Sequence, residues 1–343
     1  MPSPPENLPR VAIVGATSLC GKELKQVLED RSFPASDVVL LDESIMAGTL
    51  TEAAGEPTFI RALDKDSFDG VRFAFFTGNV PIADASWSAA LDAGATIIGL
   101  TGAAPKTEQT NAAIPALASV MPSLAVQVRN TSARRSYYAP SAPVIIACTI
   151  AAALVSFSPR RVALLFFPPV SEHDQMGIEE LETQTANLLS FRPIEQGVFG
   201  QQVAFNLVSE QAEGAKPHLP EVRNAIAGEV ARLLGGHVPV PAIQLVQAPV
   251  FYGYAFALLA EFDSARDVQQ VESAFANLGV TIAAEGSAPT NVSVAGENGI
   301  HLGRIQADPN IATAVWAWGA ADNLRLAATN AVRIAEELLG GSK

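Results

Sequence analysis

Short apolar runs alternate with amphipathic segments along the first 140 residues. The runs are rich in β-branched and aromatic residues and end at glycine or polar residues, as buried strands do. They lie at residues 11–14, 38–41, 73–76 and 96–98, with a helix expected over 87–93. Strands that alternate with helices indicate a parallel sheet covered on both faces. We therefore expect a doubly wound, parallel-sheet Rossmann domain over residues 1–137.

The pattern changes after residue 137. The apolar run over 144–157 is shorter than the roughly 20 residues that a membrane span needs, so it predicts a buried helix. Further strands are expected over 161–167, 203–208, 243–247, 250–261 and 280–284, and further helices over 177–189, 221–234 and 271–278. This order is typical of an α+β domain with a mostly antiparallel sheet, here over 138–322. The last helix, within 323–343, is expected to return to the first domain.

Composition narrows the classes of partner. The chain has 343 residues and a net charge of −13, which argues against nucleic acid or an anionic membrane as the main partner. Two cysteines, Cys20 and Cys148, are too few for a disulfide framework or a cysteine-based metal site. The densest group of other metal ligands is Glu172, His173 and Asp174, but three neighbours on a loop rarely all face one ion, so we expect no metal. The polar start of the chain lacks an apolar signal core, and we expect a cytoplasmic protein.

A glycine-rich segment joins the first expected strand to the helix after it. Glycines at this junction permit a tight turn and let a pyrophosphate approach the start of the helix. Serine stands where a middle glycine is expected; its Cβ can crowd a phosphate, and its hydroxyl can bond one. The expected cofactor-binding residues of this loop are Gly15, Ala16, Thr17, Ser18, Leu19 and Gly21.

Two acidic residues, Asp42 and Glu43, end the second expected strand. A carboxylate there can accept hydrogen bonds from both hydroxyls of an adenosine ribose, and it repels a 2′-phosphate. If a dinucleotide binds, the sequence therefore favours NAD over NADP. A solvated acidic strand end is the alternative.

Several segments together resemble the aspartate-semialdehyde dehydrogenase family. They follow the family's order over nearly the whole chain: Val-Ala-Ile-Val-Gly-Ala-Thr at 11–17, Gly-Ile-Glu-Glu-Leu-Glu-Thr-Gln-Thr at 177–185, Gln-Val-Ala-Phe-Asn at 202–206, Ala-Pro-Val-Phe-Tyr-Gly at 248–253, Leu-Gly-Arg-Ile at 302–305 and Ala-Asp-Asn-Leu-Arg at 321–325. The resemblance implies a dinucleotide-binding domain, an α+β catalytic and dimerisation domain, and a homodimer. It points to a divergent paralogue of the USG-like kind, which lacks the catalytic cysteine.

The family's chemistry needs a thiolate at a helix N-terminus, where the helix dipole lowers the pKa of a thiol, and a histidine as acid and base. The family's Asn-Pro-Asn-Cys motif aligns in two registers, which put either Ala142 or Ile145 at the position of the nucleophile. Tyr254 stands in place of the histidine, and Gln247 in place of the arginine that binds the substrate carboxylate. Cys148 lies further into the apolar run, and we expect it to be a buried, protonated thiol.

Other family positions are also replaced. The phosphate-binding segment reads Leu-Thr-Gly-Ala-Ala-Pro at 100–105, without its arginine. The residues that recognise the 2′-phosphate of NADP align with Glu43 and Ile45, and a glycine-rich turn reads Glu-His-Asp-Gln at 172–175. Loss at several separate sites is hard to explain by an alignment error.

Two hypotheses remain open. In the first, the chain is a homodimeric homologue that has lost aspartate-semialdehyde dehydrogenase activity and serves as a binding or regulatory protein that can hold NAD. In the second, it is an NAD(P)-dependent oxidoreductase that reduces another aldehyde or carbonyl substrate without a covalent thiol step. Tyr254, His173 and Ser141 would be its candidate polar groups.

Overall fold

A computed structural model of the chain describes residues 8–53, 56–77, 84–100, 111–127, 136–210, 218–236 and 238–340. The chain divides into two compact units. The first unit holds Met1–Ala118, Leu124–Ser141 and Ala327–Lys343, and the second holds Ser119–Ser123 and Ala142–Leu326.

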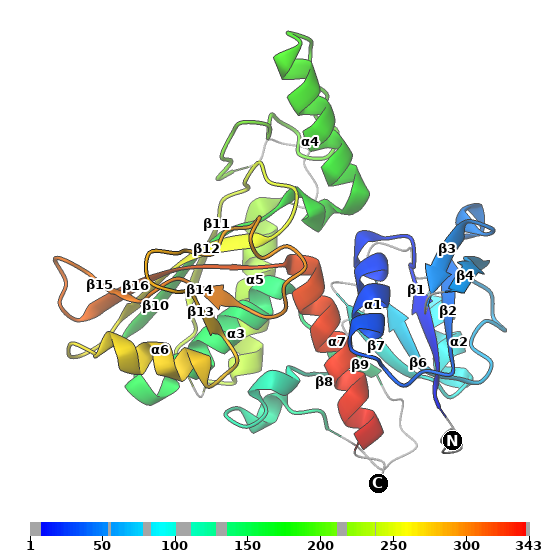
Figure 1. Cartoon of the computed structure of the whole chain (residues 1–343), viewed down its shortest axis with the longest axis horizontal. Helices are drawn as coiled ribbons and strands as arrows, with labels where there is room; N and C mark the ends of the chain where they lie inside the picture. Colours follow the sequence, from blue (N-terminus) through cyan, green and yellow to red (C-terminus); the bar gives the residue numbers. More distant parts are fainter. Residues whose placement is uncertain are drawn as a thin grey trace. The chain divides into compact units, whose positions relative to one another are not determined.

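The first unit is built on a parallel sheet of seven strands (Figure 1). The sheet order is β5-β2-β1-β6-β7-β9-β8, so the chain crosses from one side of β1 to the other between β2 and β6. Ligands of doubly wound sheets bind at such a switch point, beyond the carboxyl ends of the strands. The strands are β1 (Arg10–Val14), β2 (Asp37–Asp42), β5 (Arg61–Ala62), β6 (Val71–Phe76), β7 (Thr96–Leu100), β8 (Asn111–Ala112) and β9 (Ser136–Ala139).

Helices cover this sheet because its strands are apolar on both faces. Ala12 and Val14 of β1 pack into a core with Phe76 of β6 and with Trp87 of α2 (Asp84–Asp92). Helix α1 (Leu19–Asp30) follows β1 directly. The last helix, α7 (Asn323–Gly340), contributes residues 327–340 to this unit. Its Asn330 Nδ2 donates to the carbonyl oxygen of Ala113 at 2.9 Å. A hairpin of β3 (Leu50–Ala53) and β4 (Glu56–Phe59) lies outside the main sheet.

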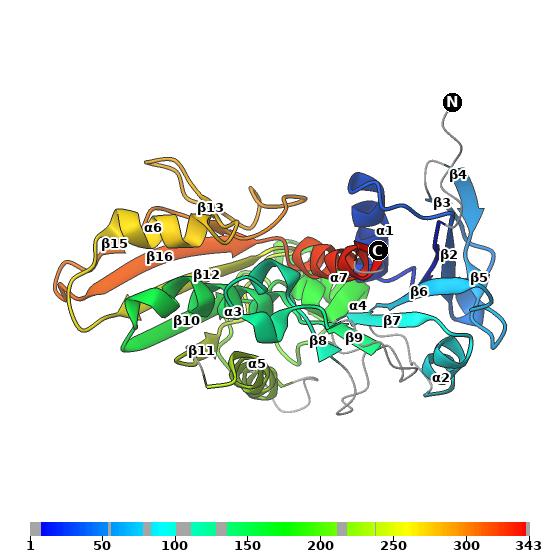
Figure 2. The same cartoon turned by 90° about the horizontal axis from the view of Figure 1, so that it is seen from below.

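The second unit has a mixed, mostly antiparallel sheet in the order β11-β10-β12-β16-β14-β13, with β15 paired to β16. Helices α3, α5 and α6 pack together on one face, and Figure 2 looks toward this helix layer. The strands are β10 (Arg161–Phe167), β11 (Ala242–Leu245), β12 (Tyr254–Glu261), β13 (Thr281–Ile282), β14 (His301–Leu302), β15 (Gln306–Ala307) and β16 (Ala314–Ala321). The helices are α3 (Ala142–Leu154), α5 (Leu219–Leu234) and α6 (Val268–Ala276).

Two sequence-based expectations for this unit were wrong, and one strand was missed. Residues 203–208 form no strand, and Val208 makes only an isolated bridge to Gln247. The strand expected from residue 250 begins only at Tyr254. Gly253 has a φ of +81°, so residues 250–253 cannot belong to one continuous extended segment with the strand. The central strand β16 was not predicted, although Trp316 and Trp318 alternate with buried residues along it.

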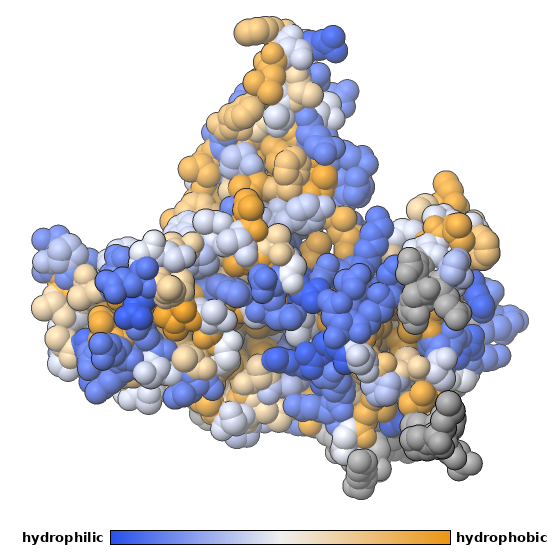
Figure 3. All heavy atoms as spheres, in the orientation of Figure 1, coloured by the Kyte–Doolittle hydropathy of each residue, from blue (hydrophilic) through white to orange (hydrophobic). Residues whose placement is uncertain are grey.

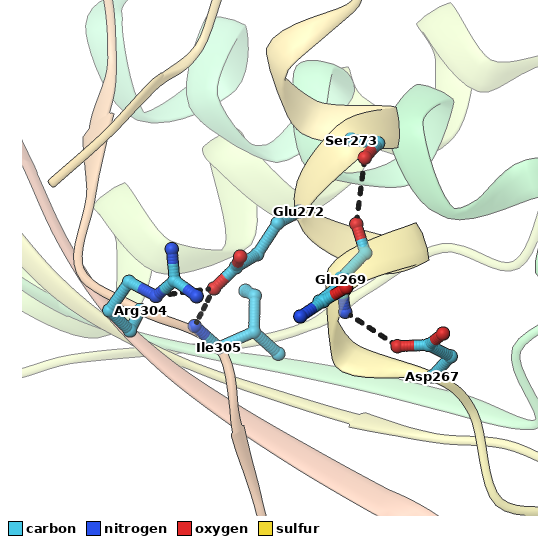
Figure 4. Close-up of polar contacts among 6 residues, drawn as sticks. All are labelled: Asp267, Gln269, Glu272, Ser273, Arg304 and Ile305. Atoms are coloured by element: carbon cyan, nitrogen blue, oxygen red, sulfur yellow. Dashed lines mark hydrogen bonds and ion pairs between the residues drawn. The ribbon is translucent and has the colours of Figure 1, made fainter. Parts of the chain in front are cut away.

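Helix α6 is held to the sheet by one buried carboxylate (Figure 4). Glu272 Oε1 accepts the backbone N–H of Ile305 at 3.0 Å and lies 3.1 Å from Arg304 Nε. The helix starts at Asp267, whose Oδ1 accepts the N–H of Gln269 at 2.9 Å, as an N-cap does. Two residues of the Leu-Gly-Arg-Ile segment, Arg304 and Ile305, thus hold helix α6 in place.

An arm stands out from the second unit (Figure 1). It consists of α4 (Asp174–Leu189) and the chain after it. Gln184 fastens that chain: its Nε2 donates to the carbonyl oxygens of Glu195 and Gln201 at 3.0 and 3.1 Å, and its Oε1 accepts the N–H of Val203 at 2.8 Å. The Glu180 carboxylate accepts two further backbone N–H groups of the same chain. The polar residues of the family-like segments 177–185 and 202–206 thus build the arm.

Within the described ranges, each helix is too short or too polar to cross a membrane.

Candidate functional site

The glycine loop lies at the switch point of the first unit, between β1 and α1. Gly15 has a φ of +81°, which side chains rarely tolerate, and its N–H donates to the carbonyl oxygen of Leu41 at 2.9 Å. A Cβ at Gly21 would clash with the carbonyl oxygen of Gly15. Both glycines are therefore required by the turn itself. The ends of β1 and β2 lie side by side here.

Ser18 closes this turn from within. Its hydroxyl caps α1 by accepting the N–H of Gly21 at 2.9 Å, and it donates to the carbonyl oxygen of Gly15 at 2.7 Å. Thr77 Oγ1 donates to the same carbonyl oxygen at 2.9 Å and lies 3.2 Å from Ser18 Oγ. The Ser18 hydroxyl therefore takes part in the turn and does not point outward as a donor for a phosphate.

Asp42 fastens the loop to the end of β2. Its Oδ2 accepts both the N–H and the hydroxyl of Thr17, at 2.8 and 2.7 Å, and its Oδ1 accepts the N–H of Glu43 at 2.9 Å. The residue is buried, whereas Glu43 is exposed. The structure brings together the loop and Asp42 as the sequence suggested, but through bonds within the protein. Nucleotide binding by Gly15, Ala16, Thr17, Ser18, Leu19, Gly21, Asp42 and Glu43 stays a prediction.

The first turn of α3 carries both candidate positions of the nucleophile. Ala142 is the first residue of the helix and Ile145 the fourth, and both are buried. A thiol at the first position would meet the positive end of the helix dipole, which lowers a thiol's pKa. The alanine and isoleucine found here have no nucleophilic atom. The choice between the two registers stays open.

The environment of Cys148 does not activate its thiol. It is buried within α3, and burial, followed by the charge of Glu229, raises its pKa to about 12, against a smaller opposing effect of Arg232. At pH 8 a thiol of that pKa is a thiolate only about once in ten thousand molecules. The expectation of a buried, protonated thiol agrees with this environment.

We expect Cys148 to resist thiol reagents in the folded protein. Cys20 is also buried, so Ellman's reagent at pH 8 should report almost no thiol before unfolding and both thiols after unfolding in guanidinium. Because the pKa is raised, the thiolate fraction should stay low until the pH approaches 12. A thiol that reacts within minutes in the folded state, and that is absent from Cys148→Ser, would contradict this environment.

Tyr254 lies at the centre of a hydrogen-bond network at the start of β12. Its hydroxyl donates to the carboxylate of Glu172, in the 3₁₀ turn η5 (Val170–His173). Asn323 Nδ2 donates to Glu172 Oε1 at 2.7 Å and to Ser171 Oγ at 3.2 Å, and Asn323 Oδ1 accepts the N–H of Gly253 at 3.0 Å. This network ties η5, the start of β12 and the start of α7 together.

The network makes Tyr254 a poor acid or base. Desolvation, with the nearby Glu172 charge and the hydrogen bond to it, raises the pKa of Tyr254 well above its usual value. Desolvation also raises the pKa of the Glu172 carboxyl, although part of the residue is accessible to solvent. The hydrogen bonds from Asn323 and Tyr254 lower this pKa, but by less than desolvation raises it. Tyr254 is buried at 1% exposure, so its hydroxyl is occupied inside the protein.

Gln247 has an internal role as well. Its Nε2 donates to the carbonyl oxygens of Pro168 and Ala248, at 2.9 and 3.1 Å, and the residue is 1% exposed. The side chain joins the ends of β10 and β11 and does not offer a charge to a substrate carboxylate.

His173 is half-buried against Phe199, with ring centroids 4.8 Å apart, and burial lowers its pKa. Among the residues that the structure describes, no three His, Cys, Asp or Glu side chains are grouped so that they could hold a metal ion. Residues 101–105 of the phosphate-binding segment lie outside the described ranges.

Sequence reasoning missed the residues that organise the glycine loop and the hydrogen-bond network around Tyr254. Asn323 was part of a family-like segment but was given no role, and Glu172 was considered only as one of three neighbouring metal ligands and as part of a changed turn. Thr77 carries no motif: it follows β6, and only the parallel pairing of β1 with β6 brings it beside the loop.

Each of the two units contains a segment that matches a known protein family. Residues 10–124 match the family described as semialdehyde dehydrogenase, NAD binding domain, and residues 169–326 match semialdehyde dehydrogenase, dimerisation domain. A USG-1 protein homolog of Pseudomonas aeruginosa is 31% identical over 96% of this chain and 97% of its own length. An aspartate-semialdehyde dehydrogenase of Rickettsia bellii is 27% identical over the same shares.

Solved structures agree. A probable aspartate-semialdehyde dehydrogenase from Pseudomonas aeruginosa superposes with a TM-score of 0.85 at 28% identity, covering 98% of this chain and all of the other. Aspartate semialdehyde dehydrogenase II from Vibrio cholerae, complexed with ASA, gives a TM-score of 0.84 at 26% identity, covering 97% of this chain and 99% of the other. With both domains matched and a relative 31% identical along nearly its whole length, this chain belongs to the semialdehyde dehydrogenase family.

Proposed function

We propose that this protein is a homologue of aspartate-semialdehyde dehydrogenase that does not catalyse that reaction. It holds a dinucleotide, NAD rather than NADP, in its first unit and acts in the cytoplasm as a homodimeric binding or regulatory protein. The observation that carries the proposal is the first turn of α3, where both candidate nucleophile positions, Ala142 and Ile145, are buried and apolar. Covalent catalysis on an aldehyde needs a nucleophile with a base to activate it, and both groups are replaced here.

The environments of the other replaced groups support this proposal. Tyr254 and Gln247 are each 1% exposed, and their polar side-chain atoms form hydrogen bonds within the protein. A general acid must reach the reacting atom at about 3 Å, which a hydroxyl held by a neighbouring carboxylate does not do. These contacts also speak against Tyr254 as the proton donor of a different carbonyl reductase.

Calorimetric titration with NAD and NADP, followed by phosphate-dependent oxidation of aspartate semialdehyde, tests the proposal. We expect NAD binding and no turnover above the background without protein. Turnover at an ordinary enzyme rate would overturn the proposed loss of activity, and binding of neither nucleotide would overturn the proposed cofactor. Steady NADH consumption with another aldehyde would support the alternative oxidoreductase.

The free face of the second sheet supports the homodimer. Helices α3, α5 and α6 cover one face, and the side chains that point to the other face are mostly apolar. Leu259 pairs with Trp316 across the strands, and the rings of Phe167 and Trp318 lie 5.7 Å apart. Trp316 and Trp318 are 41% and 38% exposed, which is a large apolar area to leave in water.

Both indole N–H groups on this face already have partners. Trp316 Nε1 donates to Asp308 Oδ2 at 2.7 Å, and Trp318 Nε1 donates to the carbonyl oxygen of Pro289 at 2.9 Å. The rings therefore present their apolar surfaces, as aromatic residues do at the centre of protein interfaces. We propose that the same face of a second copy covers them, because a twofold axis pairs one surface with itself.

The arm extends this surface. Figure 3 shows hydrophobic atoms along it, and its exposed apolar side chains include Met176, Leu189 and Phe191, the last at 99% exposure. The match to a dimerisation domain, over residues 169–326, covers the arm and the strands β12 and β16 of the free sheet face. We propose that both contribute to the dimer.

A further inference from the structure

We infer that the second unit carries a docking surface for an arginine-rich segment of another protein. This acidic aromatic surface consists of Asp174, Glu182, Phe251 and Tyr252. It would supply the partner of the proposed binding protein, so it rests on that proposed role, but it involves neither the dinucleotide nor a second copy of the chain.

Two neighbouring aromatic residues are exposed beside the base of the arm. Phe251 and Tyr252 are each 39% exposed. The N–H of Ser171 donates to the carbonyl oxygen of Phe251 at 3.1 Å, so this segment lies against η5, which leads directly into α4. The turn at Gly253, whose N–H donates to Asn323 Oδ1 at 3.0 Å, separates the two aromatic residues from β12. They therefore stay outside the core of the sheet and in contact with water.

Negative charge from two elements acts on the Tyr252 side chain. Desolvation, followed by the charges of Glu182, Asp174 and Asp322, raises the pKa of the Tyr252 hydroxyl. Glu182 is exposed on α4, where Asp174 is the first residue, and Asp322 immediately precedes α7. The raised pKa keeps the hydroxyl protonated, so the ring stays neutral. A cation above it would be attracted both by the face of the ring and by the carboxylates around it.

The segments that form this surface supply no positive side chain of their own. Residues 168–191 and 247–254 contain no lysine or arginine. Arg325, in the first turn of α7, is 7% exposed, and its Nε donates to Asn298 Oδ1 at 3.0 Å. The first of the two segments contains five acidic residues: Glu172, Asp174, Glu179, Glu180 and Glu182. A partner with positive charge would therefore complement the surface.

Arginine is the side chain that fits both components of the surface. Its guanidinium group stacks on aromatic rings and donates two parallel hydrogen bonds to a carboxylate, whereas the lysine ammonium group is a compact, strongly hydrated charge. A second copy of the chain, with its net charge of −13, would add negative charge here. A small amine would neutralise a carboxylate but leave most of the aromatic area in water. An extended protein segment with several arginines covers both rings and carboxylates.

Fluorescence anisotropy of a labelled peptide of Arg-Gly-Ser repeats, titrated with the full chain, tests the inference. The wild type should bind this peptide at least about twofold more tightly than Lys-Gly-Ser repeats, and should not bind Gln-Gly-Ser repeats. Tyr252→Ser/Glu182→Gln removes one ring and one charge, and it should weaken binding by about tenfold. Glu182→Lys keeps the ring and should weaken binding by a similar factor, which secures the test if the double variant fails to fold.

Phe59→Ser/Asp263→Asn is the matched control, because it also removes one exposed ring and one exposed carboxylate. Phe59 belongs to the first unit, and Asp263 follows the opposite end of β12 from Tyr254. This variant should bind the arginine peptide within about twofold of the wild type. Equal weakening in both double variants would show that net charge alone attracts the peptide, and would overturn the inference.

Spermidine tests the competing occupant. If it binds more tightly than the arginine peptide, and this binding is lost in Tyr252→Ser/Glu182→Gln, the surface belongs to a small amine and the inferred partner is wrong. These titrations contain neither nucleotide nor aldehyde. Their failure therefore leaves the proposed NAD binding and loss of activity unaffected, whereas turnover of aspartate semialdehyde would refute the proposed function without removing the docking surface.

Discussion

Replacing Ala142 or Ile145 with cysteine should leave the protein inactive on aspartate semialdehyde, at least about 10²-fold below a complete enzyme of the family and as much as 10⁴-fold. A restored thiol still lacks a base, since Tyr254 is buried and donates to Glu172. It also lacks the cation that would hold the substrate carboxylate, since Gln247 bonds two backbone carbonyls. Phosphate-dependent NAD(P)H formation, followed over hours at high protein concentration, is the measurement.

Stepwise restoration provides the control for this result. Tyr254→His and Gln247→Arg should each add little to a cysteine variant alone and more together, because residues that act as one unit are non-additive. Gln247→Arg should also lower the melting temperature, since it buries a charge where an amide now bonds Pro168. Activity within tenfold of a complete enzyme from a single cysteine would show that the other replacements are harmless.

The double substitution Trp316→Glu/Trp318→Glu should convert the protein from dimer to monomer. Each change places a charge on the free sheet face, where two copies are proposed to meet, and aromatic residues at the centre of an interface contribute about 2–4 kcal/mol each. The dissociation constant should therefore rise by about 10³-fold or more. Sedimentation velocity over a range of concentrations measures this change.

The exposed Phe59 of the β3–β4 hairpin provides a matched control, because it is 59% exposed but belongs to the first unit. Phe59→Glu should remain a dimer. Trp316→Ala/Trp318→Ala, which adds no charge, should weaken the dimer in the same direction and guards against misfolding of the glutamate variant. A dimer that persists at nanomolar concentration in both tryptophan variants would place the interface elsewhere.

Four of the seven strands of the first sheet were predicted, because they have apolar residues on both faces, whereas the short strands β5, β8 and β9 were not. The runs 11–14, 38–41 and 73–76 lie within β1, β2 and β6, since burial on both faces leaves a continuous apolar signal. The second sheet has one accessible face, and there the signal weakens. In β16, exposed tryptophans stand where polar residues would normally mark the solvent face, so the strand alternation was hidden.

For the candidate site too, some features could be predicted from the sequence and others could not. Alanine or isoleucine at 142 or 145, glutamine at 247 and tyrosine at 254 can be read from the sequence as departures from the family-like motifs. What these side chains contact cannot be read from it, because the roles of Glu172 and Asn323 depend on contacts between segments about 150 residues apart. The same holds for Asp42, whose type suggested a ribose ligand but whose neighbour in space is Thr17.

The serine in the glycine loop has a consequence for how this protein could change over time. A ligand that binds only the folded state adds to stability, so a protein that relies on its cofactor for stability cannot easily lose it. Here Ser18 caps α1, and Thr77 bonds the same turn. The loop is thus held by bonds within the protein, so we expect substitutions elsewhere in the proposed nucleotide site to cost little folding stability. A fold held in this way can be kept while the chemistry that it supports changes.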